Sequence, residues 1–109
     1  MANAKQKFLE LIKESEKPVL VDFYADWCRF CKQLSPELQK VADLKRGEVV
    51  CIKVNVETNP TVSDQFKVKG LPTLLLFQKG QVLWRNSGAI SASELEKVLD
   101  QHVTVASEN

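Results

Sequence analysis

Runs of apolar residues along the chain predict four β-strands. The most pronounced run covers 19–24, and its nearly continuous apolar character is typical of a strand buried on both faces. A single acid, Asp22, interrupts this run. The other three predicted strands lie at 48–56, 74–77 and 82–86. Because only a short turn at Lys79-Gly80 separates the last two, we expect them to pair as an antiparallel hairpin.

Apolar positions spaced three and four residues apart predict helices around these strands. The first predicted helix spans 4–15 and ends before Lys17-Pro18, because proline cannot continue the hydrogen-bond ladder. The second includes 34–44 and contains Pro36, where we expect a kink.

Two further helices are predicted from their starting signals. A short one begins at Asn59-Pro60, with asparagine as the cap and proline at the first helical position. The last one begins at a capping box, in which the Ser91 side chain accepts from the third backbone N–H and the Glu94 side chain accepts from the first. We expect this helix to end near Gln101.

The order helix, strand, helix, strand, helix, hairpin, helix predicts an α/β fold in a single domain over 1–109, with a frayed tail at 103–109. The strands at 19–24 and 48–56 are joined through a helix, so they should be parallel with a right-handed crossover. All four strands are largely apolar, so helices should cover both faces in a three-layer α/β/α sandwich. In open sheets of this kind a site lies beyond the carboxyl ends of the parallel strands.

The composition restricts the classes of function. Fifteen basic and fourteen acidic side chains nearly cancel and are spread along the chain, which does not indicate a partner nucleic acid or membrane surface. The first residues lack the apolar segment of a signal peptide, and no apolar run reaches membrane-spanning length. Three cysteines do not make the disulfide framework of a secreted protein. We therefore expect a cytoplasmic protein.

Cys28 and Cys31 are the strongest candidates for chemistry. They lie where a strand leads into a helix, and the free N–H groups and positive dipole of a helix N-terminus favour a thiolate. A redox dithiol fits this position; inert packing is the simpler alternative. A zinc site would have only Cys51 and His102 as further cysteine or histidine ligands, at a spacing that fits no zinc pattern. Attachment of a c-type haem requires histidine where Lys32 stands.

The neighbouring motifs are similar to those of a known family. Trp-Cys-x-x-Cys-Lys follows Val-Asp-Phe-Tyr-Ala, and Gly-Leu-Pro-Thr, Lys-Gly and Ser-Gly-Ala come later in the chain. From about Phe8 to His102 the sequence resembles thioredoxin. The resemblance implies a thioredoxin-like fold and a monomeric protein-disulfide reductase without metal or organic cofactor. It also implies disulfide-containing protein substrates and recycling by a reductase of the thioredoxin reductase type.

The resemblance implies roles for four residues. Cys28 would be the exposed nucleophile and Cys31 the buried resolving thiol. Asp22 matches a buried carboxylate that helps to move the proton of the resolving cysteine, and Lys53 matches its partner. The residues themselves support a special role for Asp22, since an acid in an apolar strand is costly unless a function or a partner retains it. The alternative is an aspartate at a solvated strand end.

Five more residues match the substrate side of the family's site. Pro72 matches a cis-proline that faces the disulfide and leaves the preceding backbone free to pair with substrate. The surface that receives the substrate polypeptide is matched by Trp27, Leu71, Gly88 and Ala89.

Two residues between the cysteines depart from the family's pattern. Arg29-Phe30 replaces the usual Gly-Pro. Arginine beside Cys28 should stabilise its thiolate, which makes the couple less reducing, although Asp26 opposes this effect. Alternatively, both side chains point to solvent and affect only partner choice, with Phe30 as a docking aromatic. This departure favours disulfide oxidase or isomerase activity as a second candidate function; a non-catalytic binding module is the third.

The family's strand before the first helix should be short or missing, because the chain starts almost at that helix. Four main strands and four helices would remain, with the strand that carries Cys51 at or near an edge. We interpret Cys51 as a small packing residue, with a regulatory thiol as the alternative. Trp84 is expected to pack in the hairpin, and His102 to continue the apolar face of the last helix.

Overall fold

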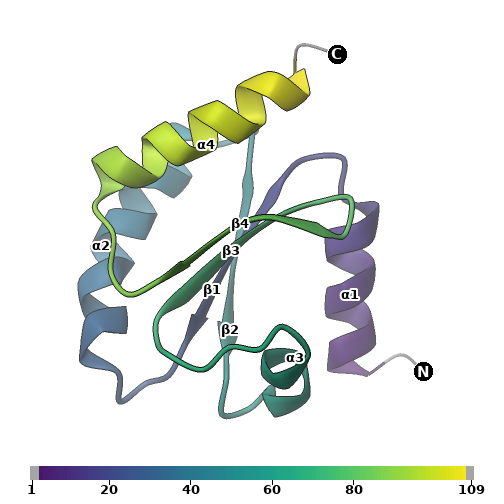
Figure 1. The fold of residues 1–109 in the computed structure, drawn as a ribbon, viewed down its shortest axis with the longest axis vertical. Coiled ribbons are helices and arrows are strands. Elements are labelled where there is room, and N and C mark those ends of the chain that lie inside the picture. Colours follow the sequence, from purple (N-terminus) through teal and green to yellow (C-terminus); the bar gives the residue numbers. More distant parts are fainter. Residues whose placement is uncertain (1–2, 108–109) are drawn as a thin grey trace.

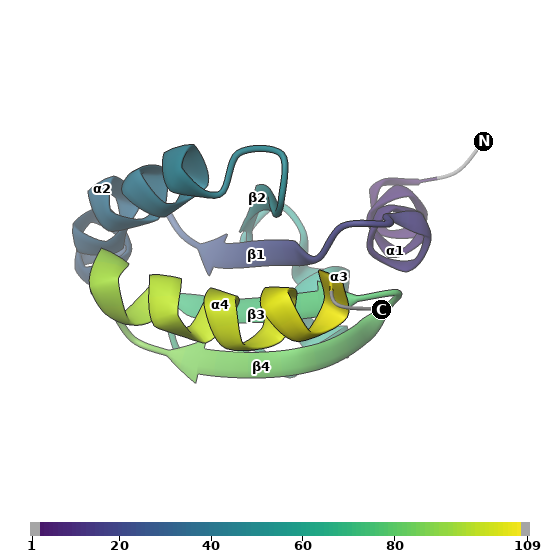
Figure 2. The ribbon, with the colours of Figure 1, turned by 90° about the horizontal axis from the view of Figure 1, so that it is seen from above.

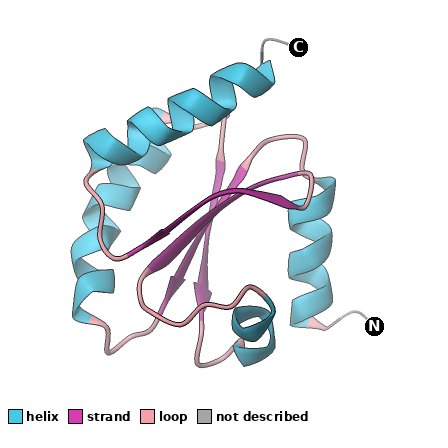
Figure 3. Ribbon diagram, in the orientation of Figure 1, coloured by secondary structure: helices cyan, strands magenta, loops and turns pink. Residues whose placement is uncertain are grey.

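The computed structural model describes residues 3–107, with side chains as far as His102. Figure 3 shows helices on both sides of a central sheet. The elements in chain order are α1 (Ala4–Glu14), β1 (Val19–Tyr24), α2 (Arg29–Leu44), β2 (Val50–Asn55), α3 (Pro60–Gln65), β3 (Thr73–Gln78), β4 (Gln81–Ser87) and α4 (Ala92–Ser107).

The sheet has four strands in the order β2-β1-β3-β4. β1 and β2 are parallel, whereas β3 is antiparallel to both β1 and β4. The parallel crossover and the hairpin are therefore confirmed. The described residues before α1 include no strand, so β2 with Cys51 forms an edge as expected.

Helices cover both faces of the sheet, as Figures 1 and 2 show. α2 and α4 pack over one face and α1 and α3 over the other, so the three-layer sandwich is confirmed. Side chains alternate along β1: Leu20 packs in the cluster under α2 and α4, and Val19, Val21 and Phe23 pack under α1 and α3. This alternation places Asp22 on the same face as Leu20, beneath α2.

The ends of several elements differ from the predictions. α2 begins at Arg29, immediately after the N-cap Cys28, and so includes more than 34–44. β2 is shorter than the predicted 48–56. α4 continues to Ser107, beyond the predicted end near Gln101, in a stretch without glycine or proline. The frayed tail at 103–109 stays a prediction. Residues 108–109 lie outside the described part of the chain.

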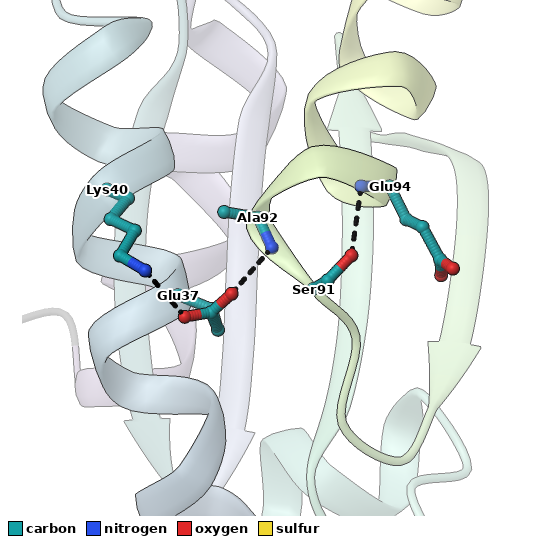
Figure 4. Close-up of polar contacts among 5 residues, drawn as sticks. All are labelled: Glu37, Lys40, Ser91, Ala92 and Glu94. Atoms are coloured by element: carbon teal, nitrogen blue, oxygen red, sulfur yellow. Dashed lines mark hydrogen bonds and ion pairs between the residues drawn. The ribbon is translucent and has the colours of Figure 1, made fainter.

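The start of α4 depends on a side chain from another helix. The Glu94 N–H donates to the Ser91 hydroxyl at 3.2 Å, which is half of the predicted capping box. The carboxylate of Glu94 points away from Ser91 in Figure 4, so the return bond is not formed. Instead the Ala92 N–H donates to the Glu37 carboxylate of α2 at 3.0 Å, and Lys40 contacts the same carboxylate at 3.0 Å (Figure 4). A long-range hydrogen bond from α2 therefore caps this helix together with the local bond to Ser91.

At the start of α3, the side chain of the N-cap residue forms a hydrogen bond within its own segment. Asn59 is the N-cap residue of α3, as predicted, but its side chain makes no capping bond and donates to the Asn55 carbonyl at 3.0 Å. Pro36 lies within α2, and the kink expected there stays a prediction. No helix in the described part of the chain combines the length and apolar character needed to span a membrane.

Candidate active site

Cys28 and Cys31 lie at the N-terminus of α2, just beyond the carboxyl end of β1. Cys28 is the N-cap residue with extended backbone, and Cys31 lies in the first turn. Their Cα atoms are 5.2 Å apart and their side chains form a disulfide. The Cys31 N–H donates to Cys28 Sγ at 3.1 Å, so this sulfur accepts one of the free N–H groups of the helix terminus.

The structure corrects the expected difference in exposure between the two cysteines. Cys28 is 5% exposed and Cys31 is 6% exposed, so neither is the more accessible residue in the disulfide form. Both cysteines belong to one apolar cluster with Ala25, and Val56 and Leu71 pack against this cluster. The assignment of Cys28 as nucleophile therefore depends on its position at the cap.

Asp22 is buried within β1, with only 1% of the residue exposed. The alternative of a solvated strand end is therefore wrong. Its Oδ1 has no hydrogen-bond partner among the described residues. Burial raises the pKa of Asp22 from its ordinary value of 3.8 to about 6, and the nearby Lys53 ammonium partly opposes this rise.

Lys53 is brought to Asp22 by the register of the parallel strands. The two residues are partners across β1 and β2. The Lys53 ammonium lies 4.6 Å from the centroid of the Tyr24 ring, in cation–π contact. Tyr24 and Lys53 lie beside the disulfide, since both line one hollow of about 260 Å³ together with Cys31. The sequence analysis assigned no role to Tyr24, which appeared there only as the last residue of a strand and as part of the Val-Asp-Phe-Tyr-Ala motif.

The segment that contains Pro72 packs against the two cysteines through Leu71. The Leu71–Pro72 peptide bond is cis, as the resemblance implied. The Gly88 N–H donates to the Pro72 carbonyl at 2.8 Å, which joins this segment to the end of β4. Gly88 has a φ of 96°, a conformation that favours glycine. Ala89 is exposed next to it.

Large exposed side chains border the disulfide. Trp27 is 68% exposed and Phe30 is 56% exposed, and Arg29 is also exposed. These three, together with Cys28 and Leu71, line a groove beside the site. The predicted surface residues Trp27 and Leu71 are thus brought together at the disulfide. The effect of Arg29 on the redox couple stays a prediction.

The groove also contains residues that the sequence analysis missed. Val68 and Lys69 line it, and they immediately precede the Gly-Leu-Pro-Thr motif. Their position next to that motif was the feature of the sequence that could have indicated a place in the site.

The other residues considered in the sequence analysis are Cys51, Trp84 and His102. Cys51 is half-buried on β2 and packs against the cluster under α2 and α4, and burial raises the pKa of its thiol. Trp84 packs against the same cluster, as expected. His102 is half-buried on α4. The described residues include no group of three or more His, Cys, Asp or Glu side chains that could hold a metal ion.

A CxxC disulfide at the start of a helix, in an α/β sandwich with a cis-proline segment beside it, is the site of a thiol–disulfide oxidoreductase. The Thioredoxin family model matches residues 1–101. The chain belongs to the thioredoxin family, and it is an oxidoreductase with protein-disulfide reductase activity.

Individual relatives agree with this assignment. The chain is 41% identical over 88 residues to Thioredoxin 1 of Chlorobaculum tepidum, covering 81% of this chain and 87% of that protein. It is 39% identical over 92 residues to a thioredoxin of Acidithiobacillus ferridurans, covering 84% and 85% of the two chains. The crystal structure of chloroplastic thioredoxin z superimposes with a TM-score of 0.82 at 29% identity, covering 91% of this chain and 88% of that one.

Proposed function

We propose that this protein reduces protein disulfides with Cys28 as the nucleophile and Cys31 as the resolving thiol. The observation that carries the proposal is the 3.1 Å hydrogen bond from the Cys31 N–H to Cys28 Sγ at the N-terminus of α2. In the reduced protein, a thiolate at this position would accept the same N–H and lie at the positive end of the helix dipole.

The proposed reaction has two exchange steps. The Cys28 thiolate attacks a sulfur of the substrate disulfide, whose S–S bond breaks, so a mixed disulfide forms and the other substrate sulfur leaves as a thiolate. The Cys31 thiol loses its proton and attacks Cys28 Sγ. The Cys28–Cys31 bond forms and the second substrate sulfur is released. Two electrons pass from the protein dithiol to the substrate, and the two substrate thiolates take up protons.

We propose that Asp22 accepts the proton of Cys31. Asp22 shares a face of β1 with Leu20, which packs under α2, the helix that carries Cys31. Its pKa of about 6 makes its carboxylate a stronger base than an exposed aspartate, while it is still mostly ionised at pH 7. Lys53 would hold this pKa below the value that burial alone would produce.

Trapping of the mixed disulfide tests the order of the two cysteines. Cys31→Ser should accumulate a covalent complex with a disulfide substrate such as insulin, because no resolving thiol remains. Cys28→Ser should form none. Mass spectrometry of the trapped species identifies the bonded residue. A complex formed through Cys31 in the Cys28→Ser variant, at a similar rate, would overturn the assignment.

Arg29 supports disulfide oxidase or isomerase activity as a second candidate. A cation beside a thiolate stabilises the reduced form and makes the disulfide more oxidising. The equilibrium of the Cys28–Cys31 couple in graded thiol/disulfide buffers, read by thiol trapping and mass spectrometry, separates the two candidates. A strongly reducing couple supports the reductase, and a clearly oxidising one supports the alternative.

The partner and the compartment are further parts of the proposal. We propose recycling by a thioredoxin reductase-type enzyme, action as a monomer in the cytoplasm, and a role in electron transport and redox homeostasis. Family membership supports the recycling enzyme. The free thiol of Cys51 suits a reducing compartment. One relative, 35% identical over 99 residues, is chloroplastic thioredoxin Y of rice, so cell fractionation should test plastids as well as cytoplasm.

A further inference from the structure

An open groove of about 470 Å³ begins at Cys28 and extends between the start of α2 and the segment before the cis-proline. Its surface is mainly apolar, with contributions from Trp27, Phe30, Val68 and Leu71. Because Cys28 itself lines the groove, a polypeptide whose cysteine meets Cys28 would place its next two or three residues there, at about 3.3 Å per residue.

The charged residues that line this groove have one sign. Arg29 and Lys69 line it, and no aspartate or glutamate does. Both cations are exposed, and neither takes part in an ion pair within the described part of the chain.

The nearest carboxylates along the sequence lie outside the groove. Asp26 lines the hollow that contains Cys31 instead. Glu57 and Asp64 each follow a residue that lines the groove, but neither lines it. The groove is therefore an apolar surface with two cations that have no acidic neighbour in its lining.

We propose that this groove selects substrates, and that it prefers a disulfide-bonded segment with aspartate or glutamate and a large apolar residue within three positions of the attacked cysteine. A guanidinium binds a carboxylate through paired hydrogen bonds, and the lysine adds a second positive charge. The apolar side chain would lie against Phe30 and Leu71. This inference rests on the proposed function, because the segment is bound only while Cys28 reacts with its disulfide.

The size of the preference follows from the exposure of the two cations. An exposed ion pair is worth a factor of about 1.5 to 5 in binding, so two pairs should together change kcat/KM by a factor of about 2 to 25. Since solvent screens such pairs, the preference should shrink in 0.5 M NaCl.

The test uses three disulfide-bonded peptides. In each peptide the first two positions after one cysteine carry the same residue, which is Glu, Gln or Lys, and the third position is leucine. Stopped-flow measurement of the second-order rate constant with the reduced protein should place Glu above Gln and Gln above Lys. The Glu peptide should react at least fivefold faster than the Lys peptide. Replacing its leucine with serine should slow the Glu peptide about threefold.

Charge reversal provides the matched variants. Arg29→Glu/Lys69→Glu should invert the order of the peptides, and the neutral Gln peptide reports any separate effect of Arg29 on the Cys28 thiol. Lys97→Glu makes the same kind of change on α4, away from the groove, and should leave the order unchanged.

The outcomes separate the two proposals. Equal rates for all three peptides would overturn the preference while disulfide reduction stands. A preference that persists unchanged in Arg29→Glu/Lys69→Glu would also overturn it. If wild-type protein reduces none of the peptides, nor insulin, the proposed function fails, and the substrate preference fails with it.

Discussion

Replacing Asp22 with asparagine should stabilise the protein, by an amount that depends on pH. The pKa of Asp22 rises from 3.8 to about 6 on folding, because burial disfavours its charged form. Each pKa unit corresponds to about 1.4 kcal/mol, so the ionised carboxylate lowers the free energy of unfolding by about 3 kcal/mol at pH 7. Asp22→Asn removes this charge.

The sign follows from proton binding. Between pH 3.8 and about 6 the native protein binds more protons at Asp22 than the unfolded chain does. The free energy of unfolding contributed by this group therefore falls as pH rises through that window. At pH 4 the penalty is under about 1 kcal/mol, and it approaches its full value of about 3 kcal/mol by pH 7.

Guanidinium chloride unfolding of the oxidised protein from pH 4 to pH 8 measures this effect. The stability advantage of Asp22→Asn over wild type should grow by about 2 kcal/mol between pH 4 and pH 7. The change with pH is the decisive quantity, because any packing effect of the amide is independent of pH. Parallel stability curves for the two proteins would refute a raised pKa at Asp22.

A second substitution checks the role of Lys53 in the same experiment. Lys53 lowers the pKa of Asp22, so Lys53→Met should raise that pKa and widen the pH window over which stability falls. In the Asp22→Asn background the same substitution should leave the shape of the stability curve unchanged. A similar effect in both backgrounds would show that Lys53 acts on stability by another route.

Three further outcomes are expected. Restoring the family's usual pair with Arg29→Gly/Phe30→Pro should lower the reduction potential, on the order of 30 mV for a tenfold change in the equilibrium constant; an unchanged or higher potential would contradict the role of Arg29. Leu34→Ala, at a fully buried position, should lower the free energy of unfolding by about 3 kcal/mol, whereas Leu44→Ala, at an exposed position of the same helix, should change it by less than about 1 kcal/mol. Glu37→Gln should lower the melting temperature at pH 7, because the hydrogen bond from the Ala92 N–H at the start of α4 lowers the pKa of this carboxyl below its ordinary value of 4.5. The difference in melting temperature should disappear as the pH falls below the pKa of Glu37. A difference that stays constant with pH would argue against capping by the carboxylate.

Local patterns in the sequence were sufficient for most of the fold. The strand at 19–24 has the predicted bounds, because a six-residue, mainly apolar run next to Pro18, rich in β-branched and aromatic residues, favours a strand over a helix. The parallel crossover and the hairpin followed from the length of the connections between strands. Asp22 was also identifiable as unusual from the local pattern, since an acid within an apolar run is unusual in any arrangement of the elements.

The tertiary structure decided what depends on contacts between distant segments. One of the two capping bonds of α4 comes from Glu37, which lies 55 residues before Ala92 in sequence and is brought to it only by the packing of α2 beside α4. The Lys53 ammonium lies over the Tyr24 ring because of the register between two parallel strands. The hydrophobic pattern of a segment depends on the periodicity of that one element. It does not show which residues of other elements will be its neighbours across the sheet.

The same division applies to the site. The sequence by itself determined that Cys28 and Cys31 would meet, because a spacing of three at the start of a helix brings the two side chains together. Only the tertiary structure showed both residues to be covered, and only it placed Arg29 in one groove with Lys69. Burial and shared surfaces arise when separate elements pack, so they depend on the whole fold.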